Sequence, residues 1–156
     1  AARVATVGAP PGRGQIHRLA RGVLVVDDSY NANPLAVKTA LRAVAGDRRL
    51  GRRVAVLGEM LELGRRAEAL HRDTGRAAAA AGFGLLVTVG GAFAKALGEA
   101  AVEAGLAADS VKHYDDSNAA ATNLAGLLRN DDVVLIKGSR GVQTDRVVNR
   151  VVGEWA

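Results

Sequence analysis

Polar side chains that could bind a ligand or take part in chemistry are concentrated in a short segment, 27–34. It reads Asp-Asp-Ser-Tyr-Asn-Ala-Asn-Pro and follows the apolar run 23–26. Its carboxylates, hydroxyls and amides suit the binding of sugar hydroxyls or of a cation. A helix cap is the plain alternative, because Asp and Asn are common in such turns. A cap needs one residue of this kind, however, and the segment offers five. We therefore favour a binding site here.

A second polar segment, 137–141, reads Lys-Gly-Ser-Arg-Gly and follows the apolar run 133–136. Lys137 and Arg140 stand beside two glycines and ahead of an expected helix. Free backbone N–H groups at a helix start attract carboxylates and phosphates, and two cations strengthen that attraction. The segment predicts an anion site.

The sequence lacks the parts of a self-contained nucleotide-hydrolysing site. It has no GxxxxGK[ST] loop, and the GxG at 12–14 precedes the first long strand instead of following it. His17, His71 and His113 are too far apart to suggest a metal set or a triad, and His71 falls in an expected helix, which favours a surface or packing role. Cysteine is absent, which excludes thiolate ligands and nucleophiles. We expect no metal site and no complete catalytic centre within this chain.

These segments are positioned by five apolar runs that alternate with amphipathic stretches, as in strands buried on both faces of a parallel sheet. The expected strands are 23–26, 53–57, 85–89, 111–114 and 133–136, and the expected helices are 35–45, 66–81, 92–104, 117–129 and 144–155. Five successive βα units predict an α/β fold: a Rossmann-like, doubly wound, mostly parallel sheet of about five or six strands with helices on both faces. Pro34 suits a first helical turn, and Ser117 and Thr144 are expected N-caps.

The first 21 residues have a different character from the rest. Short strands are expected at 3–7 and 15–19, on either side of the turn-rich stretch 8–14. We expect 1–21 to be a short hairpin that continues from a preceding domain, and 22–156 to form one Rossmann-like domain.

Composition narrows the class of protein further. The chain has 156 residues, of which 49% are hydrophobic and 24% charged, so it can bury one ordinary core. The net charge is +5, but the basic residues are scattered and only 3% of residues are aromatic, which argues against nucleic acid as a partner. No apolar run approaches the roughly 20 residues of a membrane span. We expect a cytoplasmic protein without a membrane span.

Three segments resemble motifs of the C-terminal domain of the Mur ligase family. They are 28–34, then Gly-Glu-Met-Leu-Glu-Leu-Gly at 58–64, then Leu-Ile-Lys-Gly-Ser-Arg at 135–140, in the family's order and with suitable spacing. The first is the most specific, since sister ligases and folylpolyglutamate synthases carry a version with Ala-His. The chain departs from the pattern at Ala36, where Ser is common, and at Glu59, where Asp is usual.

The resemblance implies the last domain of a three-domain, ATP-dependent ligase of peptidoglycan precursor synthesis. ATP would phosphorylate the carboxylate of UDP-MurNAc-tripeptide, and the amine of D-Ala-D-Ala would attack the acyl phosphate. A preceding central domain would bind ATP with Mg2+, and this domain would close over the nucleotide. The domain is therefore expected to be inactive alone, with the preceding domains of the same monomeric chain as its partners.

The resemblance also implies roles for individual residues. Arg13 would reach the ATP phosphates, and Asp28 would hold the ribose hydroxyls. Five residues would bind the other substrates, the last three by holding the carboxylate of the dipeptide: Asn31, Asn33, Lys137, Ser139 and Arg140.

Two other classes remain open at this point. The segment 23–29 also resembles the start of a response-regulator receiver domain, and Thr88 and Lys137 fall near the strand ends where a receiver has Thr and Lys. A receiver, however, needs an Asp at the end of its middle strand, and 57–61 contains none. A non-catalytic nucleotide-sensing domain is the third possibility.

Overall fold

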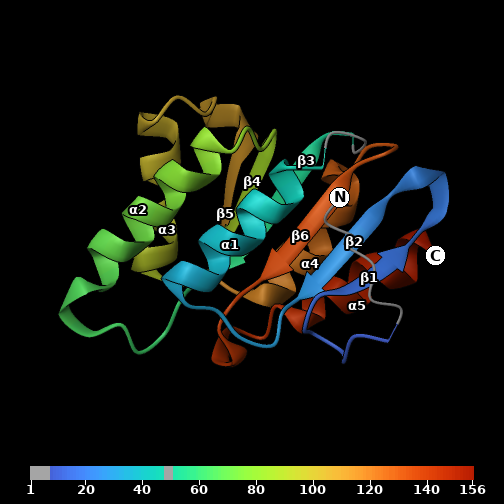
Figure 1. Cartoon of the computed structure of the whole chain (residues 1–156), viewed down its shortest axis with the longest axis horizontal. Coiled ribbons are helices and arrows are strands. Elements are labelled where there is room, and N and C mark those ends of the chain that lie inside the picture. The colour runs from blue at the N-terminus through green and yellow to red at the C-terminus, as the bar shows by residue number, and fades with distance from the viewer. Residues whose placement is uncertain (1–7, 48–50) are drawn as a thin grey trace.

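A computed structural model describes residues 8–47 and 51–156 of the chain, and the strand expected at 3–7 lies outside these residues. One six-stranded sheet, in the order β1-β2-β6-β3-β4-β5, runs through the molecule (Figure 1). Its strands are β1 (Gln15–Arg18), β2 (Leu24–Asp28), β3 (Arg53–Gly58), β4 (Leu85–Val89), β5 (Val111–Tyr114) and β6 (Val133–Lys137). Strand β1 pairs antiparallel with β2, and the other neighbours are parallel. The predicted α/β fold with a mostly parallel sheet is confirmed.

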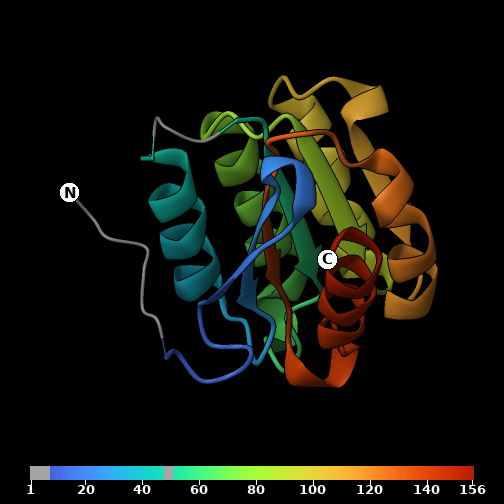
Figure 2. The same cartoon turned by 90° about the vertical axis from the view of Figure 1, so that its right-hand side faces the viewer.

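Helices cover both faces of this sheet. They are α1 (Pro34–Ala45), α2 (Ala67–Ala80), α3 (Ala92–Glu103), α4 (Ser117–Leu124) and α5 (Asp145–Trp155). Short 3-10 turns lie at Ala20–Gly22, Gly64–Arg66, Ala108–Ser110, Ala125–Leu127 and Arg140–Val142. Figure 2 shows α1 and α5 on opposite sides of the sheet. In the part of the chain that is described, no helix combines the length and the apolar character needed to cross a membrane.

The two faces follow from the direction in which the chain crosses the sheet. From β2 through β3 and β4 to β5 it moves toward one edge, and right-handed crossovers place α1, α2 and α3 on one face. It then returns to β6, which places α4 on the other face, followed by α5. Alternate strand residues separate the two cores: Val54 and Val56 pack with the α4 and α5 side, and Ala55 and Leu57 with the α1 to α3 side.

The return of the chain from β5 to β6, in the middle of the sheet, creates a place where a site can form. Strand β6 lies between β2 and β3. After β6 the chain turns to α5 on one face, whereas after β2 and β3 it turns to α1 and α2 on the other. Ligands of open α/β sheets bind beyond the strand ends where neighbouring connections diverge in this way. The ends of β2, β3 and β6 are therefore the place where a site is expected.

The helix predicted at 117–129 is shorter than expected. Helix α4 ends at Leu124, and the chain tightens into the 3-10 turn Ala125–Leu127. Gly126 weakens the helix there, and the Arg52 guanidinium donates to the Leu127 carbonyl at 2.8 Å, which gives that carbonyl a partner outside the helix.

The two predicted N-caps were wrong as capping side chains. Asp116, not Ser117, caps α4, because its Oδ1 accepts the Ala119 N–H at 2.8 Å. Thr144 does precede α5, but its side chain makes no capping hydrogen bond. It is fully buried instead, where a Cβ added at Gly58 or Gly138 would lie only 2.8 Å from its methyl group. Close packing of the strand ends took precedence over local capping.

Candidate functional site

Two adjacent hollows lie at the ends of β2, β3 and β6. The α5 hollow, of about 500 Å³, is lined by Pro11, Gly12, Asp27, Ser29, Tyr30, Arg140, Gln143, Asp145 and Asn149. The α1 hollow, of about 510 Å³, is lined by Asn31, Ala32, Asn33, Leu61, Glu62, Leu63, Ser139, Arg140 and Gly141. Arg140 lines both. The hollows are the crevices that the diverging connections around β6 create.

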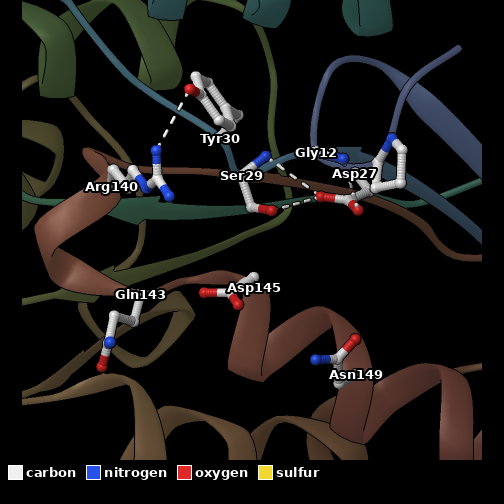
Figure 3. A pocket seen from close by; sticks show the side chains of 9 residues that line it. Gly12, Asp27, Ser29, Tyr30, Arg140, Gln143, Asp145 and Asn149 are labelled. Atoms are coloured by element: carbon white, nitrogen blue, oxygen red, sulfur yellow. Dashed lines mark hydrogen bonds between the residues drawn. The ribbon is translucent and has the colours of Figure 1, made fainter.

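The wall of the α5 hollow begins with a tight turn at 10–14, here called the Gly12 turn. The Asp27 carboxylate accepts the Gly12 N–H at 3.1 Å, and it also accepts the N–H and the hydroxyl of Ser29 at 3.2 and 2.5 Å (Figure 3). The Gly12 carbonyl in turn accepts the Tyr30 N–H at 2.9 Å. Gly12 has φ +75°, and a Cβ there would lie 3.1 Å from the Tyr30 nitrogen, so the turn requires glycine. The turn is thus fixed against the end of β2.

Two cations meet at the aromatic ring of Tyr30. The Arg13 guanidinium carbon lies 4.0 Å from the ring centroid, and that of Arg140 lies 5.3 Å from it. Arg140 also donates to the Tyr30 hydroxyl at 3.3 Å, as Figure 3 shows. Two residues that the sequence assigned to different ligands, Arg13 and Arg140, are therefore brought to the same ring.

Asp28 and Lys137, also assigned to different ligands, form an ion pair with each other. Parallel pairing of β2 with β6 places the two residues in register, on the face that carries α1. The Lys137 ammonium donates to Asp28 at 2.7 Å and to the Asn31 carbonyl at 3.0 Å, and Lys137 is only 5% exposed. Asp27, not Asp28, lines the α5 hollow. The ion pair holds the β2–α1 loop onto β6.

Ser139 and Asn33 shape the α1 hollow with intramolecular hydrogen bonds. Ser139 is buried; its hydroxyl accepts the Leu61 N–H at 2.9 Å and donates to the Ala32 carbonyl at 3.4 Å. Asn33 caps α1 by accepting the Ala36 N–H at 2.9 Å. The helix-cap alternative was thus correct for Asn33, while Asn31 remains an exposed residue of the lining.

Residues of the β3–α2 region form hydrogen bonds that fix the backbone next to the site. Glu59 accepts the Ala94 N–H at 3.2 Å, at the start of α3. His71 is fully buried; its Nε2 accepts the Met60 N–H at 2.9 Å, and its Nδ1 donates to the Ala67 carbonyl at 2.6 Å. The packing role expected of His71 is confirmed.

Three lining residues of the α5 hollow lie outside the Gly12 turn and the two polar segments that the sequence singled out: Gln143, Asp145 and Asn149. Asp145 and Asn149 are four residues apart in α5, which places them on one helix face and was a usable signal. Their side chains lie along the same side of the hollow in Figure 3. The described residues include no cluster of three or more side chains suited to holding a metal ion.

The fold and the strand-end site define the class of this protein. Residues 12–140 match the family described as Mur ligase, glutamate ligase domain, and the chain belongs to this family. The predicted resemblance is confirmed. The sheet order also overturns the receiver alternative, because a receiver sheet has its second strand at the edge beside the first, whereas here the last parallel strand, β6, lies beside the first, β2.

Three related ligases show the extent of the similarity. Over 149 residues the chain is 36% identical to UDP-N-acetylmuramoyl-tripeptide–D-alanyl-D-alanine ligase of Escherichia coli (strain K12), covering 94% of this chain and 31% of that protein. The MurF ligase of Thermotoga maritima in complex with ADP is 30% identical, with a TM-score of 0.76, over 96% of this chain and 32% of that one. MurF from Acinetobacter baumannii is 27% identical, with a TM-score of 0.81, over 94% and 31%. The chain thus spans about a third of the length of these relatives.

Proposed function

We propose that this chain is the C-terminal domain of an ATP-dependent ligase that joins D-Ala-D-Ala to UDP-MurNAc-tripeptide in peptidoglycan precursor synthesis. The proposal includes preceding domains that carry the phosphate loop and bind ATP with Mg2+, since the relatives of that name are about three times as long. It also includes a cytoplasmic location and a monomeric enzyme.

The observation that carries the proposal is the position of Arg140 between the two hollows. A ligase of this type must bring a nucleotide and an amine acceptor together at one acyl phosphate. Two hollows that share one cation provide adjacent places for these ligands. We assign the nucleotide to the α5 hollow, beside Arg13, and the dipeptide to the α1 hollow.

The proposed reaction has two steps. A carboxylate oxygen of the tripeptide attacks the γ-phosphorus of ATP, and ADP leaves. The dipeptide amine then attacks the carbonyl carbon, phosphate leaves with that carboxylate oxygen, and a proton is released as the amide forms. This domain contributes no reacting group: its residues bind, orient and exclude water when the domain closes, which protects the acyl phosphate from hydrolysis.

The role proposed for each residue depends on which of the two hollows it lies at. Arg13 contacts the nucleotide phosphates, where the planar, permanently charged fork of arginine suits phosphate oxygens better than lysine does. The contact between Asp28 and the ribose remains a prediction; the α5 hollow also offers Asp145 and Asn149 to hydroxyl groups.

In the α1 hollow, the amides of Asn31 and Asn33 face the dipeptide. Ser139, whose hydroxyl is already used twice, and Lys137, which is buried below the loop, act mainly by fixing the wall. Lys137 also places a positive charge near the carboxylate of the dipeptide.

The test uses the full-length enzyme that contains this domain. Phosphate release must depend on ATP, UDP-MurNAc-tripeptide and D-Ala-D-Ala together, and oxygen-18 in the tripeptide carboxylate must appear in the released phosphate. Arg13→Lys and Asp28→Ala are expected to lower turnover at least about ten-fold with unchanged circular dichroism. Arg42→Lys, at the opposite end of α1, is the control. Unchanged kinetics in both site variants, or tight ADP binding by this chain alone, would contradict the proposal, the latter favouring a nucleotide-sensing domain.

A further inference from the structure

Tyr30 is unusual among the residues of the site because it contacts two cations from distant parts of the chain. Arg13 comes from the Gly12 turn and Arg140 from the segment after β6, and both guanidinium carbons lie within 5.3 Å of the centroid of its ring. Tyr30 is 40% exposed and lines the α5 hollow. An aromatic face attracts a guanidinium by its quadrupole, so the ring can hold two like charges close together.

These two cations have no counter-ion among the described residues. Neither Arg13 nor Arg140 forms a salt bridge there, whereas Arg72 pairs with Glu103 at 2.6 Å and Arg150 pairs with Glu154. Two nearby carboxylates do not neutralise them. Asp27 directs its oxygens to the Gly12 turn and Ser29, and neither Asp27 nor Asp145, which line the same hollow, lies within salt-bridge distance of either guanidinium. Like charges held together without a counter-ion raise the local potential, which an anionic ligand would relieve.

We propose that Tyr30 is a positioning residue that gathers Arg13 and Arg140 into one site for the phosphate chain of a nucleotide. This inference rests on the proposed function and deepens it, because it assigns Arg140 to phosphate and not to the carboxylate of the dipeptide. A carboxylate has two oxygens and is satisfied by one guanidinium fork, whereas a polyphosphate has enough oxygens for two.

The backbone around Tyr30 supports this role. The Tyr30 N–H donates to the Gly12 carbonyl at 2.9 Å, which joins the residue that carries the ring to the turn that carries Arg13. The hydroxyl of Tyr30 accepts from Arg140 at 3.3 Å, which directs the second guanidinium to the same edge of the hollow. The ring holds the two guanidinium groups close together, and the hydroxyl adds only one hydrogen bond, from Arg140.

The test titrates the 156-residue chain with inorganic tripolyphosphate at low ionic strength and follows the arginine side-chain N–H signals by NMR. We expect the signals of Arg13 and Arg140 to shift with one common dissociation constant. Tyr30→Leu is expected to weaken binding about five-fold, while Tyr30→Phe, which keeps the ring, stays within about two-fold of the parent. Arg140→Gln is expected to weaken binding about ten-fold. Arg42→Gln, which removes the same charge at the opposite end of α1 from the site, is the matched control and stays at the parent value.

Several outcomes overturn the inference. Tyr30→Leu binding as tightly as the parent, equal losses in Tyr30→Phe and Tyr30→Leu, or no response of Arg140 to tripolyphosphate each contradict it. A response of Arg140 to D-Ala-D-Ala alone also contradicts it but leaves the proposed ligase function intact, since turnover of the full-length enzyme is measured separately. Urea midpoints of the Tyr30 variants, expected to match the parent because Tyr30 is exposed, keep a folding defect from being taken for lost binding.

Discussion

The α5 hollow and the α1 hollow have nearly the same volume but are built by different interactions. Tyr30 and Arg140, which line the α5 hollow, and Arg13, which packs on the Tyr30 ring, are exposed and form no ion pair among the described residues. The walls of the α1 hollow are tied down by a buried ammonium and a buried hydroxyl, those of Lys137 and Ser139. The exposed side chains of the α5 hollow, such as Tyr30 and Arg140, can therefore change position at little cost in folding energy, whereas the shape of the α1 hollow depends on the stability of the fold.

The largest effect is expected from removing the cation below the α1 hollow. Lys137→Met leaves Asp28 and the Asn31 carbonyl without their donor, so the free energy of unfolding is expected to fall by about 2 to 3 kcal/mol. The estimate is below the usual range for fully buried pairs because the Asp28 side chain is 27% exposed. Urea unfolding followed by circular dichroism measures it.

Two variants turn this result into a comparison. Arg140→Gln removes the same charge from the α5 hollow and is expected to change stability by less than about 0.5 kcal/mol. Adding Asp28→Asn to Lys137→Met should restore part of the loss, because it removes the unpaired charge. Equal losses for Lys137→Met and Arg140→Gln would remove the distinction between the two hollows.

A smaller effect is expected at the Gly12 turn, a part of the α5 hollow where backbone geometry is demanding. Gly12→Ala is expected to lower the free energy of unfolding by about 2 kcal/mol, since it combines a left-handed backbone with the close approach to Tyr30. Gly14→Ala is the matched control: Gly14 also has a positive φ, +84°, but a Cβ there meets nothing within 4 Å. We expect about 1 kcal/mol for it, and urea unfolding that gives the two variants the same loss would contradict the fixed turn.

The next effect concerns the hydroxyl that joins two loops of the α1 hollow. Ser139→Ala removes the acceptor of the Leu61 N–H and is expected to cost about 1 kcal/mol of stability. Amide hydrogen exchange should become faster at Leu61, while Gly14, whose N–H donates to the Asp27 carbonyl at 2.8 Å, serves as the unaffected reference. Faster exchange at both amides would mean that the two hollows are not independent.

The smallest effect is expected from an ion pair on the same face but on the helix surface. The hydrogen bond from Lys38 in α1 lowers the pKa of Asp73 in α2, and the charge of Lys38 adds to this. A carboxyl with a lowered folded-state pKa stabilises the fold above its ordinary pKa and loses that contribution as the pH falls through the lowered value. Because the Asp73 side chain is 51% exposed, solvent screens the pair, and Lys38→Met is expected to cost only about 0.5 kcal/mol at neutral pH.

The pH dependence gives a direct check of this pair. The difference in stability between the parent and Lys38→Met should vanish in acid, and NMR titration should show the pKa of Asp73 rising toward 3.8 in the variant. If Lys38→Met lowered the free energy of unfolding as much as Lys137→Met does, burial would not explain the difference expected between the two lysines.

Sequence reasoning located the strands and the polar loops well, because buried parallel strands leave continuous apolar runs and their ends carry the polar residues. It was less successful with side-chain partners. Asp28 and Lys137 were each assigned to a ligand, but they are 109 positions apart in the chain and became neighbours only when β2 paired with β6. No local pattern reports such a pairing, since the register of two distant strands depends on the packing of the whole sheet.

The sequence by itself determined the α/β architecture, the family motifs and the two loops that carry the site. Only the tertiary structure decided which polar groups are used internally and which face a ligand. Lys137 pairs with Asp28, and Lys137 and Ser139 also bond to backbone groups of the loops, because buried polar groups must find partners. Arg13, Tyr30 and Arg140 are exposed, so water can solvate them. The same polar residue types thus serve the fold in one hollow and remain available to a ligand in the other.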